Sequence, residues 1–261
     1  MSALLHALAR PIDAAWLVAA RFVFGMTMFV SMARFIAYGW IDRFFVAPRF
    51  HFTYHGFAWV EPLAPAAMHG LFWVMAALAV AMALGLWFRM VALLFALGFA
   101  YLQLVDVTIY LNHYYGAWLI GLLLAVSPAG RHGALQLRSR SFTPIGTVPA
   151  AWLVLLRAQV ATIYVFAGIA KMHADWLVHA QPLGIWLGAS TDLPVVGPLL
   201  ARPGVPLAMS WAGMLFDTTI VVWLSWSRTR ALAFAAVVLF HVATRMLFPI
   251  GMFPVIMIGS A

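Results

Sequence analysis

The chain carries a single side-chain amine, on Lys171, and it stands where a long apolar stretch ends. Asp175 follows about one helical turn later. An amine enclosed by apolar groups loses hydration, which disfavours its charged form and makes a neutral amine available. A neutral amine can accept a proton from a weak acid such as a phenol. The alternative is an interfacial anchor, because lysines at membrane boundaries extend toward the headgroups.

Other ionisable side chains also lie within or beside apolar stretches, where an ionisable group needs a partner or a polar cavity. Asp106, His113 and His241 fall, like Lys171, near stretch ends that we assign to one side of the membrane. This common depth predicts one polar pocket that opens outward. The two histidines could instead be core residues with satisfied hydrogen bonds.

Three further charged residues have simpler interpretations. Arg34 lies near the outer end of the first apolar stretch, from which it can reach the pocket. Arg157 and Asp217 lie deeper, and we expect them to form a structural ion pair.

Metal binding is not expected. His51 and His55 have the spacing of a helical ligand pair, but no third ligand is placed to complete a set and the segment HFTYH is not expected to be helical. The absence of cysteine also excludes thiolate catalysis and thiolate metal sites.

The elements that position these residues must cross a membrane. Hydrophobic residues make up 66% of the chain and charged residues 8%, whereas a soluble domain carries about a quarter charged residues. Apolar runs of about 17–25 residues are candidate spans. We therefore expect an all-α fold, a polytopic transmembrane helical bundle with about seven or eight membrane segments. The expected segments cover residues 14–36, 67–88, 90–107, 109–126, 150–170, 206–226 and 231–248, with a shorter one at 251–259.

The distribution of arginines gives an orientation. With the N-terminus in the cytoplasm, most of the arginines outside the expected spans fall on the cytoplasmic side, as the positive-inside rule requires. These are Arg10, Arg89, Arg131, Arg138, Arg140, Arg228 and Arg230. The long connections 37–66 and 171–205 then face outward, where long loops often build a site. The net charge of +8 is explained by this topology, and no nucleic-acid partner is expected. No cleavable signal is apparent at the N-terminus.

Four stretches together resemble a known family. They are DVTIYLNHYYGAWLIGLLLA (106–125), YVFAGIAKMHADWL (164–177), SWAGMLFDTTIV (210–221) and FHVATRMLFPIGMFP (240–254). In order and spacing they are similar to the transmembrane (HTTM) domain of vitamin K-dependent gamma-glutamyl carboxylases, and residues 35–63 resemble the equivalent loop of bacterial members. The resemblance implies one transmembrane domain over residues 1–261, without the large C-terminal luminal or periplasmic domain of the eukaryotic enzymes.

This resemblance implies an enzyme in the membrane, here a bacterial inner membrane, with its site facing the outer side. In the family, a reduced vitamin K hydroquinone reacts with O2 and is epoxidised, and the strong base formed on the way deprotonates a glutamate γ-carbon, to which CO2 adds. The implied cofactor is reduced vitamin K or menaquinone. The implied partners are membrane lipid, the quinone and a glutamate-containing peptide or protein.

The resemblance also carries residue roles. Lys171 matches the proposed initiating base, in an A-G-x-x-K-x-x-A-D-W pattern, and His113 is the second expected catalytic residue. The expected quinone- and substrate-binding residues are Asn112, Asp106, Tyr164, His241, Met252 and Arg34, and no metal is implied.

Two other classes of protein stay open. Bacterial membrane proteins with this transmembrane fold also serve peptide maturation, so the chain could be a non-enzymatic maturation or interaction partner, or an epoxidase that does not carboxylate. A transporter is disfavoured, because there is no inverted repeat and no pair of glycine-interrupted half-helices.

Overall fold

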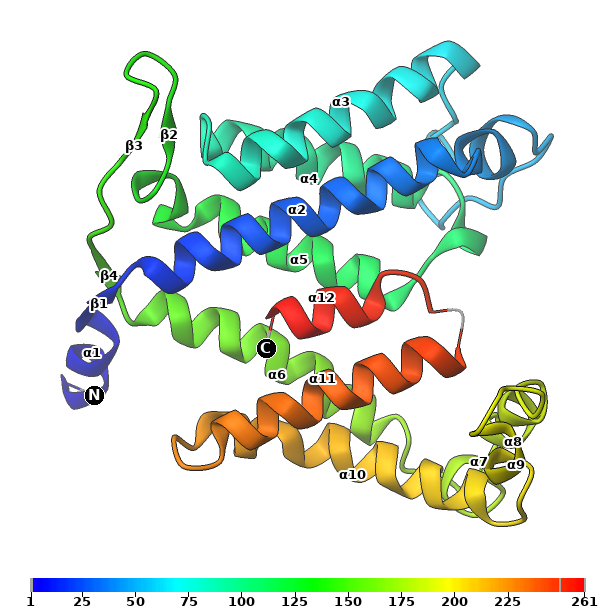
Figure 1. The fold of residues 1–261 in the computed structure, drawn as a ribbon. Coiled ribbons are helices and arrows are strands. Elements are labelled where there is room, and N and C mark those ends of the chain that lie inside the picture. The colour runs from blue at the N-terminus through cyan, green and yellow to red at the C-terminus, as the bar shows by residue number, and fades with distance from the viewer. Residues whose placement is uncertain (1, 249, 261) are drawn as a thin grey trace. The chain divides into compact units, whose positions relative to one another are not determined.

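The computed structural model describes residues 2–248 and 250–260. The chain divides into two compact units, and the boundary between Leu156 and Arg157 falls inside a helix. Figure 1 shows the helices and strands of both units. Each unit is described separately below.

The first unit is built on four apolar helices. They are α2 (Ala15–Ala37), α3 (Pro65–Leu84), α4 (Phe88–Leu104) and α5 (Asn112–Val126). The second and third expected segments, 67–88 and 90–107, correspond to α3 and α4, which are joined by a turn at Gly85–Trp87, so Arg89 lies inside α4. Gly85 ends α3 in the left-handed conformation (φ 77°), which glycine adopts without a steric penalty.

Close packing of α2 on α3 forms much of this unit's core. A Cβ on Gly25 would lie 2.7 Å from the backbone nitrogen of Ala83, so only glycine permits this approach of the two helices. At the end of the same interface the buried guanidinium of Arg21 donates hydrogen bonds to backbone carbonyls. Its acceptors are the carbonyl oxygens of Ala83, Ala129, His132 and Gly133. Arg21 therefore ties the turns at this end to α2 and has no acidic partner among the described residues.

Shorter elements complete the first unit. They are α1 (Ser2–Ala9), β1 (Pro11–Asp13), the π-helix η1 (Asp42–Val46), the 3-10 helices η2 (Val107–Ile109) and η3 (Pro128–Arg131), β2 (Leu135–Gln136), β3 (Ser141–Phe142) and β4 (Thr147–Pro149). β1 pairs antiparallel with β4, with Ile12 opposite Val148, and β2 pairs with β3. The connection between the fourth and fifth expected segments, which carries β2, β3 and β4, is thus partly stranded. The fold is mostly rather than entirely helical.

The second unit is built on α6, α10 and α11. Their bounds are Ala151–Ile169 for α6, Val205–Ser225 for α10 and Arg230–Leu247 for α11, followed by α12 (Phe253–Ser260). Their shared core contains Val160, Ile220, Val237 and Met257. The long connection before α10 folds into three short helices, α7 (Ala174–Leu177), α8 (Leu183–Gly188) and α9 (Gly197–Leu200). Leu183, Leu187 and Leu200 form a small core there.

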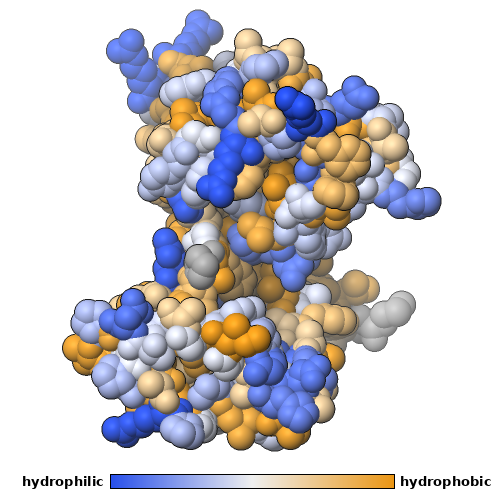
Figure 2. Space-filling model, turned by 90° about the vertical axis from the view of Figure 1, so that its right-hand side faces the viewer, coloured by the Kyte–Doolittle hydropathy of each residue, from blue (hydrophilic) through white to orange (hydrophobic). Residues whose placement is uncertain are grey.

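Five helices of the described chain are long and apolar enough to cross a membrane: α2, α3, α6, α10 and α11. Large apolar side chains on them are exposed, for example Leu239 at 71% and Trp73 at 62%, as lipid-facing side chains would be. Figure 2 shows hydrophobic residues exposed among hydrophilic ones on one face. These features support a polytopic membrane protein. The remaining expected segments, α4, α5 and α12, are shorter apolar helices, and their crossing of the membrane stays a prediction.

The start of the expected fourth segment was wrong by a few residues. That segment was expected from 109, but α5 begins at Asn112. The carboxylate of Asp106 accepts a hydrogen bond from the backbone N–H of Thr108, which stabilises η2 in place of a continuing α-helix.

Candidate active site

Lys171 lies directly after α6 and is held by an ion pair. Its Nζ donates to Oδ2 of Asp217, on α10, at 2.6 Å and to the carbonyl oxygen of Ala167 at 3.1 Å. The side chain of Asp217 is 8% exposed and that of Lys171 is 22% exposed. An ammonium and a carboxylate at this distance can stabilise each other's charge or exchange a proton. The expected ion pair between Arg157 and Asp217 was therefore wrong: Asp217 pairs with Lys171.

The close approach of α6 to α10 depends on Gly168. A Cβ at this position would overlap Cγ2 of Thr218 and lie 3.0 Å from the backbone nitrogen of Thr218. Glycine therefore allows the end of α6 to contact α10 beside Asp217. The glycine of the A-G-x-x-K pattern has a packing role that brings Lys171 within reach of the carboxylate.

Asp217 lies on the buried face of α10. This face repeats every three or four residues, as the inner face of a helix does. Its members are Ser210, Gly213, Met214, Asp217 and Ile220. The indole N–H of Trp176, on α7, donates to the carbonyl oxygen of Ser210 at 2.8 Å, and the Trp176 ring centroid lies 5.4 Å from Nζ of Lys171. Trp176 thereby anchors the connection that follows Lys171 and covers the ammonium with an aromatic ring.

Tyr164 and His241 form a second polar pair in the same unit. The Tyr164 hydroxyl and Nε2 of His241 share a hydrogen bond of 2.9 Å. Tyr164 lies on α6, and Lys171 stands two residues after the end of the same helix. Tyr164 is also close enough to Asp217 for an electrostatic interaction.

His241 is enclosed by aromatic rings and is 1% exposed. Its ring contacts are with Tyr164, Phe216, Phe240 and Phe253. The rings of Phe216 and Phe240 are stacked at 4.0 Å. Nδ1 of His241 is buried without a hydrogen-bond partner among the described residues. Met252, just before α12, is also buried in this part of the chain.

The other predicted site residues belong to the first unit. Asp106 follows α4, Asn112 and His113 begin α5, and the guanidinium of Arg34 lies over the rings of Tyr38 and Trp40. Asn112 is exposed and His113 is partly buried against the ring of Tyr114. The site residues thus fall into one group in each unit, and the single pocket that would unite them stays a prediction.

Asp106 is the best-partnered carboxylate of the first unit. It is 5% exposed, and its Oδ1 accepts hydrogen bonds from the backbone N–H and the hydroxyl of Thr108. Nδ1 of His51 donates to Oδ2 at 3.1 Å. Burial raises the pKa of Asp106, but the hydrogen bonds from Thr108 and His51 outweigh it, so the pKa lies below its usual value.

Sequence reasoning missed two of these partners. Asp217 was assigned to Arg157, although it is the one carboxylate inside an expected span of the second half of the chain. His51 was considered only as a metal ligand. Among the described residues, no group of three or more histidine, aspartate or glutamate side chains is placed to hold a metal ion. The segment containing His51 and His55 is not helical, as expected.

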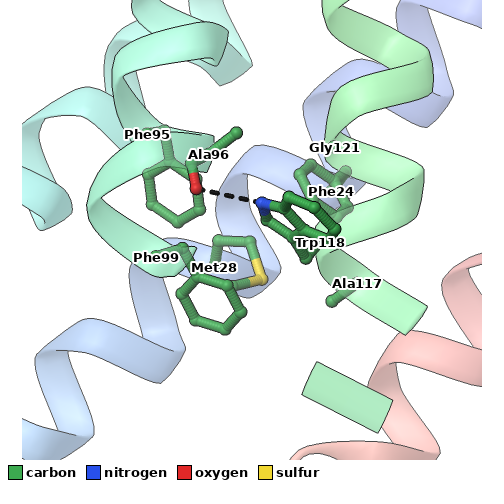
Figure 3. Close-up of a pocket in the computed structure, with 8 residues that line it drawn as sticks. All are labelled: Phe24, Met28, Phe95, Ala96, Phe99, Ala117, Trp118 and Gly121. Carbon is green, nitrogen blue, oxygen red and sulfur yellow. Dashed lines mark hydrogen bonds between the residues drawn. The ribbon is translucent and has the colours of Figure 1, made fainter. Parts of the chain in front are cut away.

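A small apolar crevice lies between α2, α4 and α5 (Figure 3). It is lined by Phe24, Met28, Phe95, Ala96, Phe99, Ala117, Trp118 and Gly121. The indole N–H of Trp118 donates to the carbonyl oxygen of Ala96 at 3.0 Å. The crevice has no room even for a water molecule, so it is a packing defect and not a ligand site.

The second unit thus combines helices long and apolar enough to cross a membrane with an ion pair between Lys171 and the buried Asp217. The chain matches the model of the HTTM domain over residues 9–261 and belongs to the HTTM family, the transmembrane domain of gamma-carboxylase-like proteins. No solved structure matches it.

Proposed function

We propose that this protein is an integral membrane enzyme that oxidises a vitamin K-type hydroquinone with O2 and couples this epoxidation to deprotonation and carboxylation of a glutamate γ-carbon. The proposal combines membership of the HTTM family with the motif around Lys171. The observation that carries it is the only side-chain amine of the chain, held 2.6 Å from a buried carboxylate.

The pair supplies the proton transfer that this reaction needs. Lys171 acts as the initiating base only when its amine has given up a proton, and Asp217 is the group in contact that can take it. The neutral amine then accepts the proton of a hydroquinone hydroxyl, becoming an ammonium, and the protonated Asp217 returns to a carboxylate by releasing its proton to water. Trp176 and the end of α6 hold the amine in place for this step.

The residues around His241 fit a flat aromatic group. Stacked Phe216 and Phe240 provide apolar ring surface, and the buried Nδ1 of His241 is a hydrogen-bonding atom that has no partner among the described residues. When bound, the hydroquinone would supply the reducing equivalents for O2. Tyr164 would fix the orientation of His241 through their hydrogen bond.

The test measures products. Purified protein in lipid nanodiscs, given reduced menaquinone, should consume O2 and form the epoxide, and with a glutamate-containing peptide and labelled CO2 it should form labelled γ-carboxyglutamate. Epoxide without label would establish an epoxidase only. No O2 consumption with any reduced vitamin K would contradict the proposal.

A non-enzymatic membrane partner in peptide maturation is the second candidate. It is favoured by one observation: the amine of Lys171 already has two hydrogen-bond acceptors, so it could serve only to fasten α6 to α10. In that case Lys171 can be replaced by any residue that preserves the ion pair.

We further propose that the N-terminus is cytoplasmic and the connection 171–204 lies outside. The cysteine-free chain suits single-cysteine labelling. Val195→Cys, at a position 94% exposed, should react with an impermeant external reagent, whereas Ser139→Cys, beside β3, should not. Labelling of Ser139→Cys but not of Val195→Cys would show that the chain has the opposite orientation in the membrane.

A further inference from the structure

His51 and Asp106 form a histidine–carboxylate pair between two connections of the first unit, at 38–64 and 105–111. Nδ1 of His51 lies 3.1 Å from Oδ2 of Asp106, and the His51 side chain is 9% exposed. The two connections are also joined by a backbone hydrogen bond from the N–H of Val107 to the carbonyl oxygen of Phe52. The imidazole is therefore held at a fixed place and angle.

The carboxylate fixes the tautomer of the ring. The pKa of Asp106 lies below its usual value, because the hydrogen bonds that it accepts outweigh its burial, so it is ionised at neutral pH and can only accept hydrogen bonds. Nδ1 of His51 must therefore carry the hydrogen of that bond. In the neutral ring Nε2 is then a bare acceptor.

Nε2 of His51 is buried and has no hydrogen-bond partner among the described residues. Buried polar atoms usually have a partner, and leaving one without a partner is unfavourable. Tyr54 lies within electrostatic reach of Tyr110 and of Asp106, the partner of His51. A carboxylate-oriented imidazole with one bare nitrogen is the arrangement that catalytic and ligand-binding histidines use.

We propose that Nε2 of His51 accepts a hydrogen bond from the hydroxyl of an aromatic ligand, and that Asp106 is the positioning residue that holds the ring hydrogen on Nδ1 and so leaves Nε2 as the acceptor. The choice of a hydroquinone as that ligand rests on the proposed function. The bare nitrogen requires a donor, and an aromatic hydroxyl combines such a donor with a ring that fits beside tyrosines.

A purely structural role for the pair predicts a different outcome for one substitution. In His51→Asn the amide N–H₂ takes the place of Nδ1 and can still donate to Asp106, whereas the atom equivalent to Nε2 is gone. If the pair only fastens the two connections together, His51→Asn should behave as the unmodified protein in every assay.

The experiment compares two ligands on two proteins. Binding of menadiol, a hydroquinone, and of its dimethyl ether, which has the same ring but no hydroxyl donor, is measured without oxygen by titration calorimetry. The unmodified protein should bind menadiol about tenfold more tightly than the ether, the value of one hydrogen bond to a buried acceptor. In His51→Asn this preference should disappear, while the melting temperature stays the same.

Nitrogen-15 NMR of histidine-labelled protein provides a readout that does not depend on the variant. The His51 ring should give the signals of a neutral ring protonated at Nδ1, and menadiol should move the Nε2 signal toward that of a hydrogen-bonded nitrogen. If His51→Asn does not fold, this titration of the unmodified protein decides the question.

The possible outcomes separate this inference from the proposed function. Equal binding of menadiol and its ether, or a preference that survives in His51→Asn, overturns the role of His51 even if epoxide is formed. A preference that requires His51, in a protein that forms no epoxide, supports the role of His51 and contradicts the proposed function.

Discussion

Lys171 and Asp217 join the end of α6 to the middle of α10 through a contact of 2.6 Å, the closest ion pair between oppositely charged side chains in the described chain. The carboxylate is almost fully buried, and the ammonium keeps partial access to the surroundings. The pair therefore has an inner member that can store a proton and an outer member that can meet a ligand.

The first prediction concerns the stability of this pair. Lys171→Met leaves the carboxylate of Asp217 buried without its partner, which should lower the free energy of unfolding by about 3–5 kcal/mol. The double variant Lys171→Met/Asp217→Asn should be more stable than Lys171→Met alone, because no charge then remains to be buried. Denaturant unfolding in detergent measures both. Asp175→Asn, at a carboxylate 77% exposed, is the control and should change stability by less than about 0.5 kcal/mol. Equal stability of Lys171→Met and the unmodified protein would show that the ion pair between Lys171 and Asp217 does not stabilise the fold.

The second prediction concerns Gly168. Gly168→Ala should push α6 away from α10, because the new methyl group meets Thr218, and should cost about 1–3 kcal/mol. Epoxide formation should fall as well, since Lys171 would leave Asp217.

Gly213→Ala is the matched control. Gly213 lies on the buried face of α10, but nothing lies within 4 Å of its added Cβ. Alanine there should be neutral or stabilise by up to about 1 kcal/mol, because it favours the helix over glycine. Thr218→Ala should partly rescue Gly168→Ala. If the two glycine variants behave alike, the close contact at Gly168 is not what positions Lys171.

The third prediction is a pH dependence of stability at Asp106. Its pKa in the folded protein lies below the unfolded value of about 3.9. The ionised group therefore stabilises the fold above that value, and this stabilisation is lost as the pH falls through the lower, folded pKa. The melting temperature of Asp106→Asn should lie below that of the unmodified protein at pH 7, and the difference should shrink below about pH 4. Thr108→Val removes the hydroxyl that donates to Asp106, so the stabilisation by the ionised Asp106 should be lost at a higher pH in this variant. A melting-temperature difference between Asp106→Asn and the unmodified protein that does not change between pH 7 and pH 3 would contradict the lowered pKa of Asp106.

Hydropathy and charge predicted most of the helical framework. The apolar stretches became α2, α3, α6, α10 and α11 because spans of this length must satisfy their own backbone hydrogen bonds. The hydropathy pattern did not predict the later start of α5, because that boundary is set by one side chain, Asp106, bonding to Thr108. The strand pair β1–β4 joins residues far apart in sequence, which no local pattern encodes.

The site was predictable only where its geometry is local. Tyr164 lies on α6 and Lys171 stands two residues after its end, so their presence in one part of the fold follows from their closeness in the sequence. The partner of Asp217 depends on which helices pack together, and the expected depth in the membrane favoured Arg157 over Lys171. The signal that could have corrected this is Gly168, whose small size marks the place where α6 approaches another helix.

The most direct test of the central claim is epoxide formation by Lys171→Arg. Arginine can keep the ion pair with Asp217, so the variant should fold with an unchanged melting temperature and still bind hydroquinone. A guanidinium cannot give up its proton near neutral pH, so it cannot act as the base. We predict that the rate of epoxide formation with reduced menaquinone falls by about 10²–10⁴-fold, the usual effect of losing a general base. Turnover by Lys171→Arg near that of the unmodified protein would contradict the account and assign Lys171 to fastening the two helices.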